Sequence, residues 1–151
     1  MPTTQKTNEP ALDAANRQIV ITRLFDAPPE KIFELFTDPK HLVHWWGPGG
    51  DVFVDEFDFR VGGSWKIRGD CGPGNHFVYT RIERPNHLEW EQVIEPRIKG
   101  VVTIKPVGGK AEMTARMIFP TVEIYQQAAQ FGAGEVLSQS FDRMAAYIAA
   151  A

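Results

Sequence analysis

The chain has little of what marks secreted, membrane-spanning or nucleic-acid-binding proteins. It contains one cysteine, Cys71, so no disulfide can form within the chain, and this favours a reducing compartment. No apolar run approaches the roughly 18 residues that a membrane helix needs, and the N-terminal residues lack the apolar core of a signal peptide. The formal net charge is −3, with no cluster of Lys or Arg. We therefore expect a cytoplasmic protein with no nucleic-acid partner and no membrane insertion.

Histidine and cysteine are also few, with four His and one Cys. His41 and His44 lie three apart in a predicted helix, but no HExxH pattern or cysteine accompanies them, which favours surface histidines over a metal site. No motif places a histidine beside Cys71, so a nucleophilic role is not favoured. The glycine-rich run 47–50 lacks the Lys-Ser/Thr of a phosphate loop. The sequence thus predicts no metal and no cofactor and assigns no catalytic residue, which favours a binding protein over an enzyme.

What the chain does have is apolar and aromatic material for one sizeable core. Hydrophobic residues make up 43% of the 151 residues, typical of a single globular domain. We expect that domain over residues 16–151, preceded by a polar tail, residues 1–15, that packs loosely. Four Trp and ten Phe are many for this length, and large aromatic side chains line pockets as well as cores.

Periodicity and turn residues predict a strand, two short helices, about six strands and one long helix. Strands joined by short turns must pair antiparallel, and only the last helix is long enough to cover the apolar face of their sheet. The expected fold class is therefore α+β, a curved antiparallel sheet wrapped around a long C-terminal helix. The expected strands are 17–25, 52–59, 64–68, 76–83, 87–94, 101–105 and 111–119, and the expected helices are 30–37, 39–46 and 121–149.

The predicted C-terminal helix contains no proline and carries an apolar stripe at a spacing of three or four residues. Thr121 is its expected N-cap. Gly132 and Gly134 lie in its middle, where each costs about 1 kcal/mol relative to alanine. These glycines either allow close backbone packing or leave room for a ligand.

Several motifs, in order, resemble one known family. They are ITRLFDAP at 21–28, TDP at 37–39, WWGP at 45–48, DFRVGGSW at 58–65, IERPNHL at 82–88, and the helical segment 132–143. Over about residues 17–149 the chain resembles the START-like superfamily (SRPBCC) with its helix-grip fold. Within that superfamily it is most similar to the group named after the C-terminal domain of the activator of heat-shock-protein-90 ATPase. The resemblance implies an apolar cavity between sheet and long helix that holds lipids, polyketides, hormones or other hydrophobic molecules.

An apolar or aromatic small molecule is therefore the expected partner. Gln92 shares a strand face with Trp90 and Ile94, so its amide needs a partner, which is a ligand, another side chain or water. The related group often has glycine and then a bulky aromatic where this chain has Val136 and Leu137, so we expect Val136 to narrow the cavity. The predicted cavity-lining residues are Trp45, Trp65, Phe77, Tyr79, Trp90, Gln92, Met117, Phe119, Phe131, Gly132 and Val136.

Two alternatives remain open at this stage. A polyketide cyclase-like or hydrolase-like enzyme would need an acid–base pair from Asp55, Tyr79 and His76. Alternation along the strand places Asp55 on the same face as its apolar neighbours, although a bulge or a sheet edge would let its carboxylate reach water. A chaperone-linked interaction module would instead expose an apolar patch at Trp45, Trp46 and the run 47–50. The same patch would serve a homodimer, so the sequence leaves monomer and homodimer open.

Overall fold

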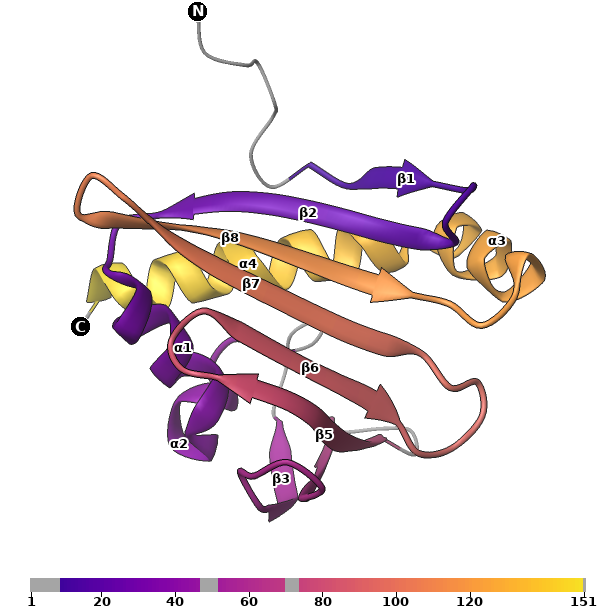
Figure 1. The fold of residues 1–151 in the computed structure, drawn as a ribbon, viewed down its shortest axis with the longest axis horizontal. Helices are drawn as coiled ribbons and strands as arrows, with labels where there is room; N and C mark the ends of the chain where they lie inside the picture. Colours follow the sequence, from indigo (N-terminus) through magenta and orange to yellow (C-terminus); the bar gives the residue numbers. More distant parts are fainter. Residues whose placement is uncertain (1–8, 47–51, 70–73, 151) are drawn as a thin grey trace, which may run out of the picture.

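The computed structural model describes residues 9–46, 52–69 and 74–150, and predictions that concern Cys71 and the run 47–50 lie outside this part. Eight strands form one antiparallel sheet in the order β1-β2-β8-β7-β6-β5-β4-β3. The helices lie on one side of it, as Figure 1 shows. The strands are β1 (Ala11–Asp13), β2 (Gln18–Phe25), β3 (Phe53–Phe57), β4 (Ser64–Arg68), β5 (Asn75–Glu83), β6 (His87–Gln92), β7 (Lys99–Val107) and β8 (Lys110–Ile118). The helices are α1 (Pro29–Thr37), α2 (Pro39–Leu42), α3 (Val122–Gln130) and α4 (Ala133–Ala150).

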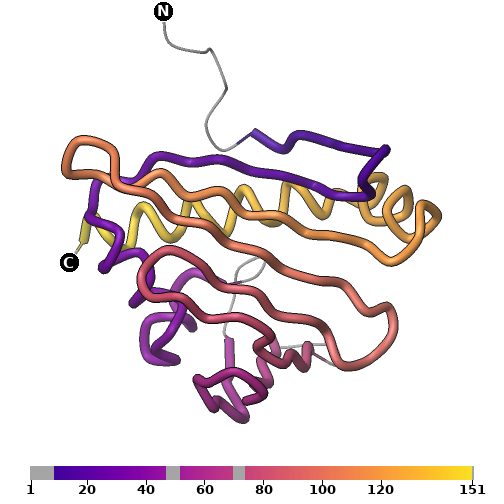
Figure 2. The backbone as a smooth tube through the Cα atoms, in the orientation of Figure 1, coloured from indigo at the N-terminus to yellow at the C-terminus, as the bar shows by residue number. Residues whose placement is uncertain are grey.

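The predicted α+β architecture is confirmed. Strands β4 to β8 run as a meander because each is joined to the next by a turn or a short loop, and the path is easily followed in Figure 2. Strand β2 closes against β8, with Ile21 opposite Ala115. Asp38 caps α2 by accepting a hydrogen bond from the Lys40 backbone N–H, and Pro39 occupies the first turn as its fixed φ favours. Helix α2 is shorter than predicted, ending at Leu42.

The prediction of a loosely packed N-terminal tail is wrong for residues 11–13. These form β1, which pairs antiparallel with β2 so that Leu12 lies opposite Ile19. Asp13 shapes the connecting turn, since its carboxylate accepts hydrogen bonds from the backbone and side chain of Asn16. A strand of three residues is too short to give a periodic signal, which explains why the sequence did not reveal it.

The prediction of one unbroken C-terminal helix is also wrong. Thr121 caps α3 as expected, accepting from the Ile124 N–H at 3.1 Å. The chain then breaks at Phe131 and Gly132, and Gly132 has φ +84°. Glycine favours this left-handed conformation, which commonly ends a helix. Gly134 serves close packing, because a Cβ there would lie 2.7 Å from Cβ of Pro10.

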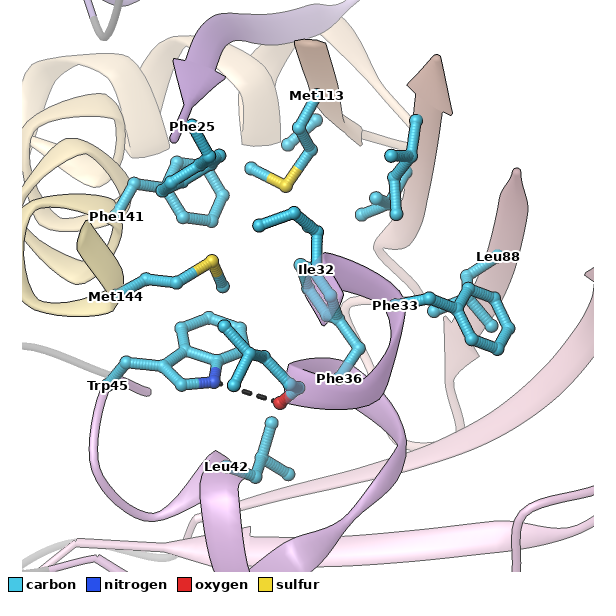
Figure 3. Packing of buried hydrophobic residues seen from close by; sticks show 14 of the residues in the cluster. Phe25, Ile32, Phe33, Phe36, Leu42, Trp45, Leu88, Met113, Phe141 and Met144 are labelled. Carbon is cyan, nitrogen blue, oxygen red and sulfur yellow. Dashed lines mark hydrogen bonds between the residues drawn. The ribbon is translucent and has the colours of Figure 1, made fainter. Parts of the chain in front are cut away.

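The hydrophobic core fills the space under the C-terminal half of α4. Figure 3 shows Phe141 and Met144 of α4 directed toward Phe25 and Trp45. The Phe25 and Phe141 rings meet edge to face, with centroids 6.5 Å apart, and the Trp45 indole donates to the Leu35 carbonyl at 3.0 Å. None of the described helices is long and apolar enough to cross a membrane.

Candidate functional site

A cavity of about 710 Å³ lies beyond the edge of this core, under the N-terminal half of α4. Phe141 belongs both to the core and to the cavity wall, so the two are continuous. The sheet supplies the opposite wall from β4 to β8, because successive strand residues point to opposite faces and every second one faces α4. On β6, for example, Leu88, Trp90 and Gln92 are buried, and the latter two reach the cavity.

Small residues keep this region from being filled by side chains. Gly100 of β7 pairs with Trp90 of β6, and a Cβ on Gly100 would lie 2.3 Å from the Trp90 indole. The Trp90 indole therefore lies along the sheet, against the backbone of Gly100. Ala115 of β8 and Ala133 of α4 also line the cavity. Larger side chains at these three positions would project into the space that α4 covers.

Aromatic rings make part of the wall rigid. The Trp65 ring lies 4.6 Å from Phe77, 5.1 Å from Trp46 and 5.8 Å from Trp90, measured between centroids. Trp46, Phe77 and Trp90 line the cavity, whereas Trp65 is buried behind them. Edge-to-face and tilted pairs of this kind are favourable beyond their buried area. The cavity thus has a packed aromatic wall that is largely pre-formed.

Gln92 of β6 and Ser140 of α4 are buried polar residues that line the cavity, and Gln92 lies on the sheet side. Its Nε2 donates to two backbone carbonyls of the β6–β7 loop, those of Ile94 at 3.2 Å and Pro96 at 2.6 Å. Two carbonyl acceptors require the NH₂ group on their side, which fixes the amide orientation. The loop is therefore the protein partner that the sequence left open, and it engages only the donor half of the amide.

The structure places the predicted site residues in two groups. Those that line this cavity are Trp45, Phe77, Trp90, Gln92, Met117 and Val136. Those that lie away from it are Trp65, Tyr79, Phe119, Phe131 and Gly132. Ligand binding by the first group stays a prediction. For each residue of the second group, the predicted position at the cavity wall has to be corrected.

Three of the corrections concern Phe131, Gly132 and Phe119, which were assigned to the cavity from the helix or strand pattern and do not line it. Phe131 is 83% exposed, because the helix break at Gly132 turns it outward instead of under the sheet. Phe119 follows β8 and packs in a separate small cluster with Ile19 and Tyr125, its ring 6.0 Å from the tyrosine ring. Strand parity alone does not show how far along the sheet a cavity extends.

Trp65 and Tyr79 are buried in the core and do not line the cavity, contrary to the prediction. Phe57 and Phe59 pack around them, with the Phe59 and Tyr79 rings at 5.0 Å. The Trp65 indole N–H has no hydrogen-bond partner within the described part of the chain. Burial raises the pKa of the Tyr79 phenol well above its ordinary value, since the low-dielectric core disfavours the phenolate.

Sequence reasoning missed further lining residues. Phe36, Gly100, Val102, Ala115, Leu137 and Phe141 all reach the cavity. Strand parity with Met117 on β8 carried a signal for Ala115. Gly100 carried none, because its role is the absence of a side chain against Trp90.

The candidate acid–base residues are not brought together. The ladder between β3 and β4 is irregular at Asp55, and its exposed carboxylate pairs with Arg68 at 2.8 Å. The bulge interpretation of Asp55 is therefore correct. His76 alternates with the inward-facing Phe77 and Asn75, so it lies on the other face, where its Nε2 has no partner among the described residues. None of the described residues that line the cavity is Asp, Glu, His, Cys or Tyr.

His41 and His44 share one side of the molecule and contact the same residue. The His41 Nε2 lies 3.2 Å from a Glu34 carboxylate oxygen, and its Nδ1 lies 2.7 Å from the Tyr147 hydroxyl. The His44 ring stacks on the Tyr147 ring at 4.8 Å. A search of the described residues finds no group of three His, Cys, Asp or Glu that would bind a metal. The pair instead ties α2 and the residues after it to the C-terminal end of α4.

The tryptophan pair is not an exposed patch. Trp45 is fully buried in the core, and the partly buried Trp46 packs edge to face on Trp65. This burial removes the main observation behind the interaction-module alternative.

Comparisons with known proteins agree with this fold. Protein Ms6760 from Mycobacterium smegmatis is 24% identical, with 94% of this chain and 97% of that chain covered and a TM-score of 0.82. A protein from Arthrobacter aurescens is 23% identical, with coverages of 91% and 88% and a TM-score of 0.80. CalU16 from Micromonospora echinospora is 19% identical, with coverages of 87% and 73% and a TM-score of 0.68. These similarities establish the fold alone.

A search of curated proteins finds no match to this chain. The family model described as "Activator of Hsp90 ATPase homolog 1-like protein" matches residues 26–149, which is most of the chain. This match agrees with the resemblance drawn from the motifs around Pro28, Trp45 and Gly63. The chain therefore belongs to the family of Activator of Hsp90 ATPase homolog 1-like proteins.

Proposed function

We propose that the protein binds an apolar or aromatic small molecule in the cavity between the sheet and the first half of α4. The observation that carries this proposal is the cavity itself, about 710 Å³ in volume and walled by Trp45, Phe77, Trp90 and Met117. Small-molecule sites typically measure about 300–1,000 Å³ and combine apolar walls with a few polar groups. The cavity has both properties.

Burial of apolar surface would supply most of the affinity. A ligand that hides about 300 Å² of apolar surface gains roughly 7 kcal/mol at about 25 cal/mol per Å². The loss of translational and rotational freedom is subtracted from this gain. Because the aromatic wall around Trp65 is already packed without ligand, little further ordering cost is expected there.

The two alternative functions find less support. General acid–base chemistry needs a titratable side chain that reaches the substrate, and the described residues that line the cavity include no Asp, Glu, His, Cys or Tyr. The family name refers to activation of the Hsp90 ATPase, but the buried Trp45 and the packed Trp46 offer no apolar docking patch. Small-molecule binding is the function that the site favours.

The proposal is tested by titration with N-phenyl-1-naphthylamine, an apolar probe that fluoresces when it leaves water. We expect saturable fluorescence and a rise in melting temperature. Ligand at 100 times its Kd adds about 2.7 kcal/mol to the free energy of unfolding, which corresponds to roughly 5–10 °C for a domain of this size.

Paired variants locate the bound probe. Ala115→Leu adds volume inside the cavity and should weaken probe binding at least tenfold. Thr114→Leu adds the same side chain one residue earlier, on the opposite face of β8, and should leave the affinity unchanged. Absence of saturable binding, or equal affinity for a folded Ala115→Leu protein and the wild type, would refute the proposed function.

A further inference from the structure

We infer that the cavity selects an uncharged ligand that carries a hydrogen-bond donor, and that the Gln92 side-chain oxygen receives this donor. The inference rests on the proposed function and adds the chemical class of the ligand. It follows from the directions in which the charged side chains around the cavity point and from the hydrogen bonds that Gln92 makes.

Arg68 borders the cavity but directs its charge away from it. It follows the buried Ile67 on β4 and is exposed, so its side chain lies on the outer face of the sheet. There its Nε lies 2.8 Å from the Asp55 carboxylate, and its guanidinium carbon lies 4.7 Å from the centre of the Phe53 ring. Both neighbours belong to β3. The charge of Arg68 is therefore paired outside the cavity.

Arg116 and Lys99 also direct their charged side chains away from the cavity. Arg116 lies between Ala115 and Met117, which both face the cavity, so its own side chain points to the other face. It donates there to the Gln18 side-chain oxygen of β2 at 3.3 Å. Lys99 precedes Gly100, whose missing Cβ would meet the Trp90 ring, so the lysine is outward as well.

Within the described ranges, the inward side chains of the cavity are therefore neutral. These lining residues include no Asp or Glu, so a cationic ligand finds no counter-charge among them. An anionic ligand finds no inward cation among them either, because the charges of Arg68, Arg116 and Lys99 point outward. Moving an unpaired ion from water into an apolar site costs several kcal/mol. The cavity should thus discriminate strongly against either charge.

Gln92 offers one acceptor to a ligand. Both donor positions of its amide face the Ile94 and Pro96 carbonyls. Its Oε1 accepts no hydrogen bond from any residue in the described ranges, and the residue is buried at the cavity wall. Because Oε1 is not among the buried atoms that lack a partner, it is open to the cavity, and an apolar ligand that covers it would leave it unsatisfied at a cost in free energy. A neutral ligand with an N–H or O–H group removes this cost, whereas a purely hydrocarbon ligand does not.

Three probes of one skeleton test the inference. N-phenyl-1-naphthylamine is neutral and has one N–H donor. Its 8-sulfonate derivative carries a negative charge, and its N-methyl derivative is neutral and lacks the donor. We expect the sulfonate to bind the wild-type protein at least tenfold more weakly than the parent amine, and the N-methyl compound to bind about five- to tenfold more weakly.

The variant Gln92→Met tests whether Gln92 is the group that accepts the ligand's hydrogen bond. Methionine keeps the length of the side chain and removes the amide. We expect the ratio of the affinities for the parent amine and the N-methyl compound to fall toward one in this variant. A ratio within one variant cancels any general loosening of the β6–β7 loop. The wild-type comparison of the three probes stands even if the variant does not fold.

The outcomes separate this inference from the function on which it rests. Competitive binding of the sulfonate as tight as that of the parent amine would overturn the neutral-ligand inference and leave the proposed function intact. Equal affinities for the parent and N-methyl compounds, or a ratio unchanged in a folded Gln92→Met protein, would overturn the role of Gln92. Failure of all three probes to saturate would refute the proposed function itself.

Discussion

Tyr79 has a phenol group that can ionise but is buried in the core, away from the cavity. Its ring lies between Phe57, Phe59 and Trp65, and none of the described residues donates to or accepts from its hydroxyl. Burial raises its pKa above the ordinary value of 10.0. The group therefore links folding to pH in the alkaline range.

The sign of this link follows from proton binding. Above pH 10 the unfolded chain releases the Tyr79 proton while the folded protein retains it, so stability falls as pH rises. Below pH 10 both states hold the proton and Tyr79 contributes no pH dependence. We predict that Tyr79→Phe removes part of the loss of stability between pH 9 and 11, measured by urea unfolding. Identical pH profiles for Tyr79→Phe and the wild type would contradict this prediction. The other two tyrosines are present in both proteins.

Single residues were predicted well where a local rule decides their role. Asp38 caps α2 and Thr121 caps α3 as expected from their types and positions. Gln92 was recognised as a buried amide that needs a partner, but its partners are two loop carbonyls whose positions depend on how residues 93–98 fold. Local patterns identify a buried polar side chain that needs a hydrogen-bond partner, but they do not identify the partner.

The contact between α4 and the segment before β1 depends on Gly134. A Cβ at this position would lie 2.7 Å from Cβ of Pro10 and 3.4 Å from Cγ2 of Ile19. Pro10 directly precedes β1, whose pairing with β2 spans residues 11–13. Because contacts closer than 3.0 Å do not persist, Gly134→Ala must displace Pro10 and loosen this edge strand.

We predict that Gly134→Ala accelerates amide hydrogen exchange in residues 11–16 by at least tenfold, read by mass spectrometry. Alanine favours the helix by about 1 kcal/mol over glycine, so global stability changes little. Gly132→Ala is the matched control. Its Cβ meets open space, but alanine is strained at φ +84°, so this variant should lose about 1 kcal/mol of global stability without faster exchange at β1. Unchanged exchange in Gly134→Ala would show that Pro10 does not depend on the contact.

Elements were predictable in proportion to their length. Strands such as β4 and β8 agree with the sequence within one residue at either end, because five or more alternating residues give a clear period. Strand β1 has three residues and was missed. The break at Gly132 was hidden because the apolar stripe continues across it, with Ile124 before and Leu137 after. A glycine with φ +84° and a mid-helix glycine look alike in a sequence.

At the scale of the whole molecule, topology was easier to predict than the cavity. Short turns force neighbouring strands to pair antiparallel, so the order of β3 to β8 follows from the chain. The cavity depends instead on what fails to fill the space between layers. Gly100 and Ala115 leave room on the sheet, and the helix break sends Phe131 outward. A missing side chain, or one that turns outward at a helix break, leaves no periodic pattern in the sequence.

Val136 occupies the mouth of the cavity. It lines the interior, yet 36% of its surface is exposed to solvent. We infer that a ligand enters and leaves beside this residue. We therefore expect any narrowing by Val136 to act at this side of the cavity and not at the wall formed by Phe77 and Trp90.

We therefore predict that Val136→Phe slows both association and dissociation of N-phenyl-1-naphthylamine at least fivefold in stopped-flow fluorescence, while Kd changes less than about threefold. A larger side chain at an opening raises the barrier for both directions equally and alters the bound state little. Val122→Phe is the control, because Val122 on α3 is 39% exposed and lies away from the cavity. Its rates should equal those of the wild type. A change in Kd with an unaltered association rate would place Val136 against the bound ligand instead of at the opening.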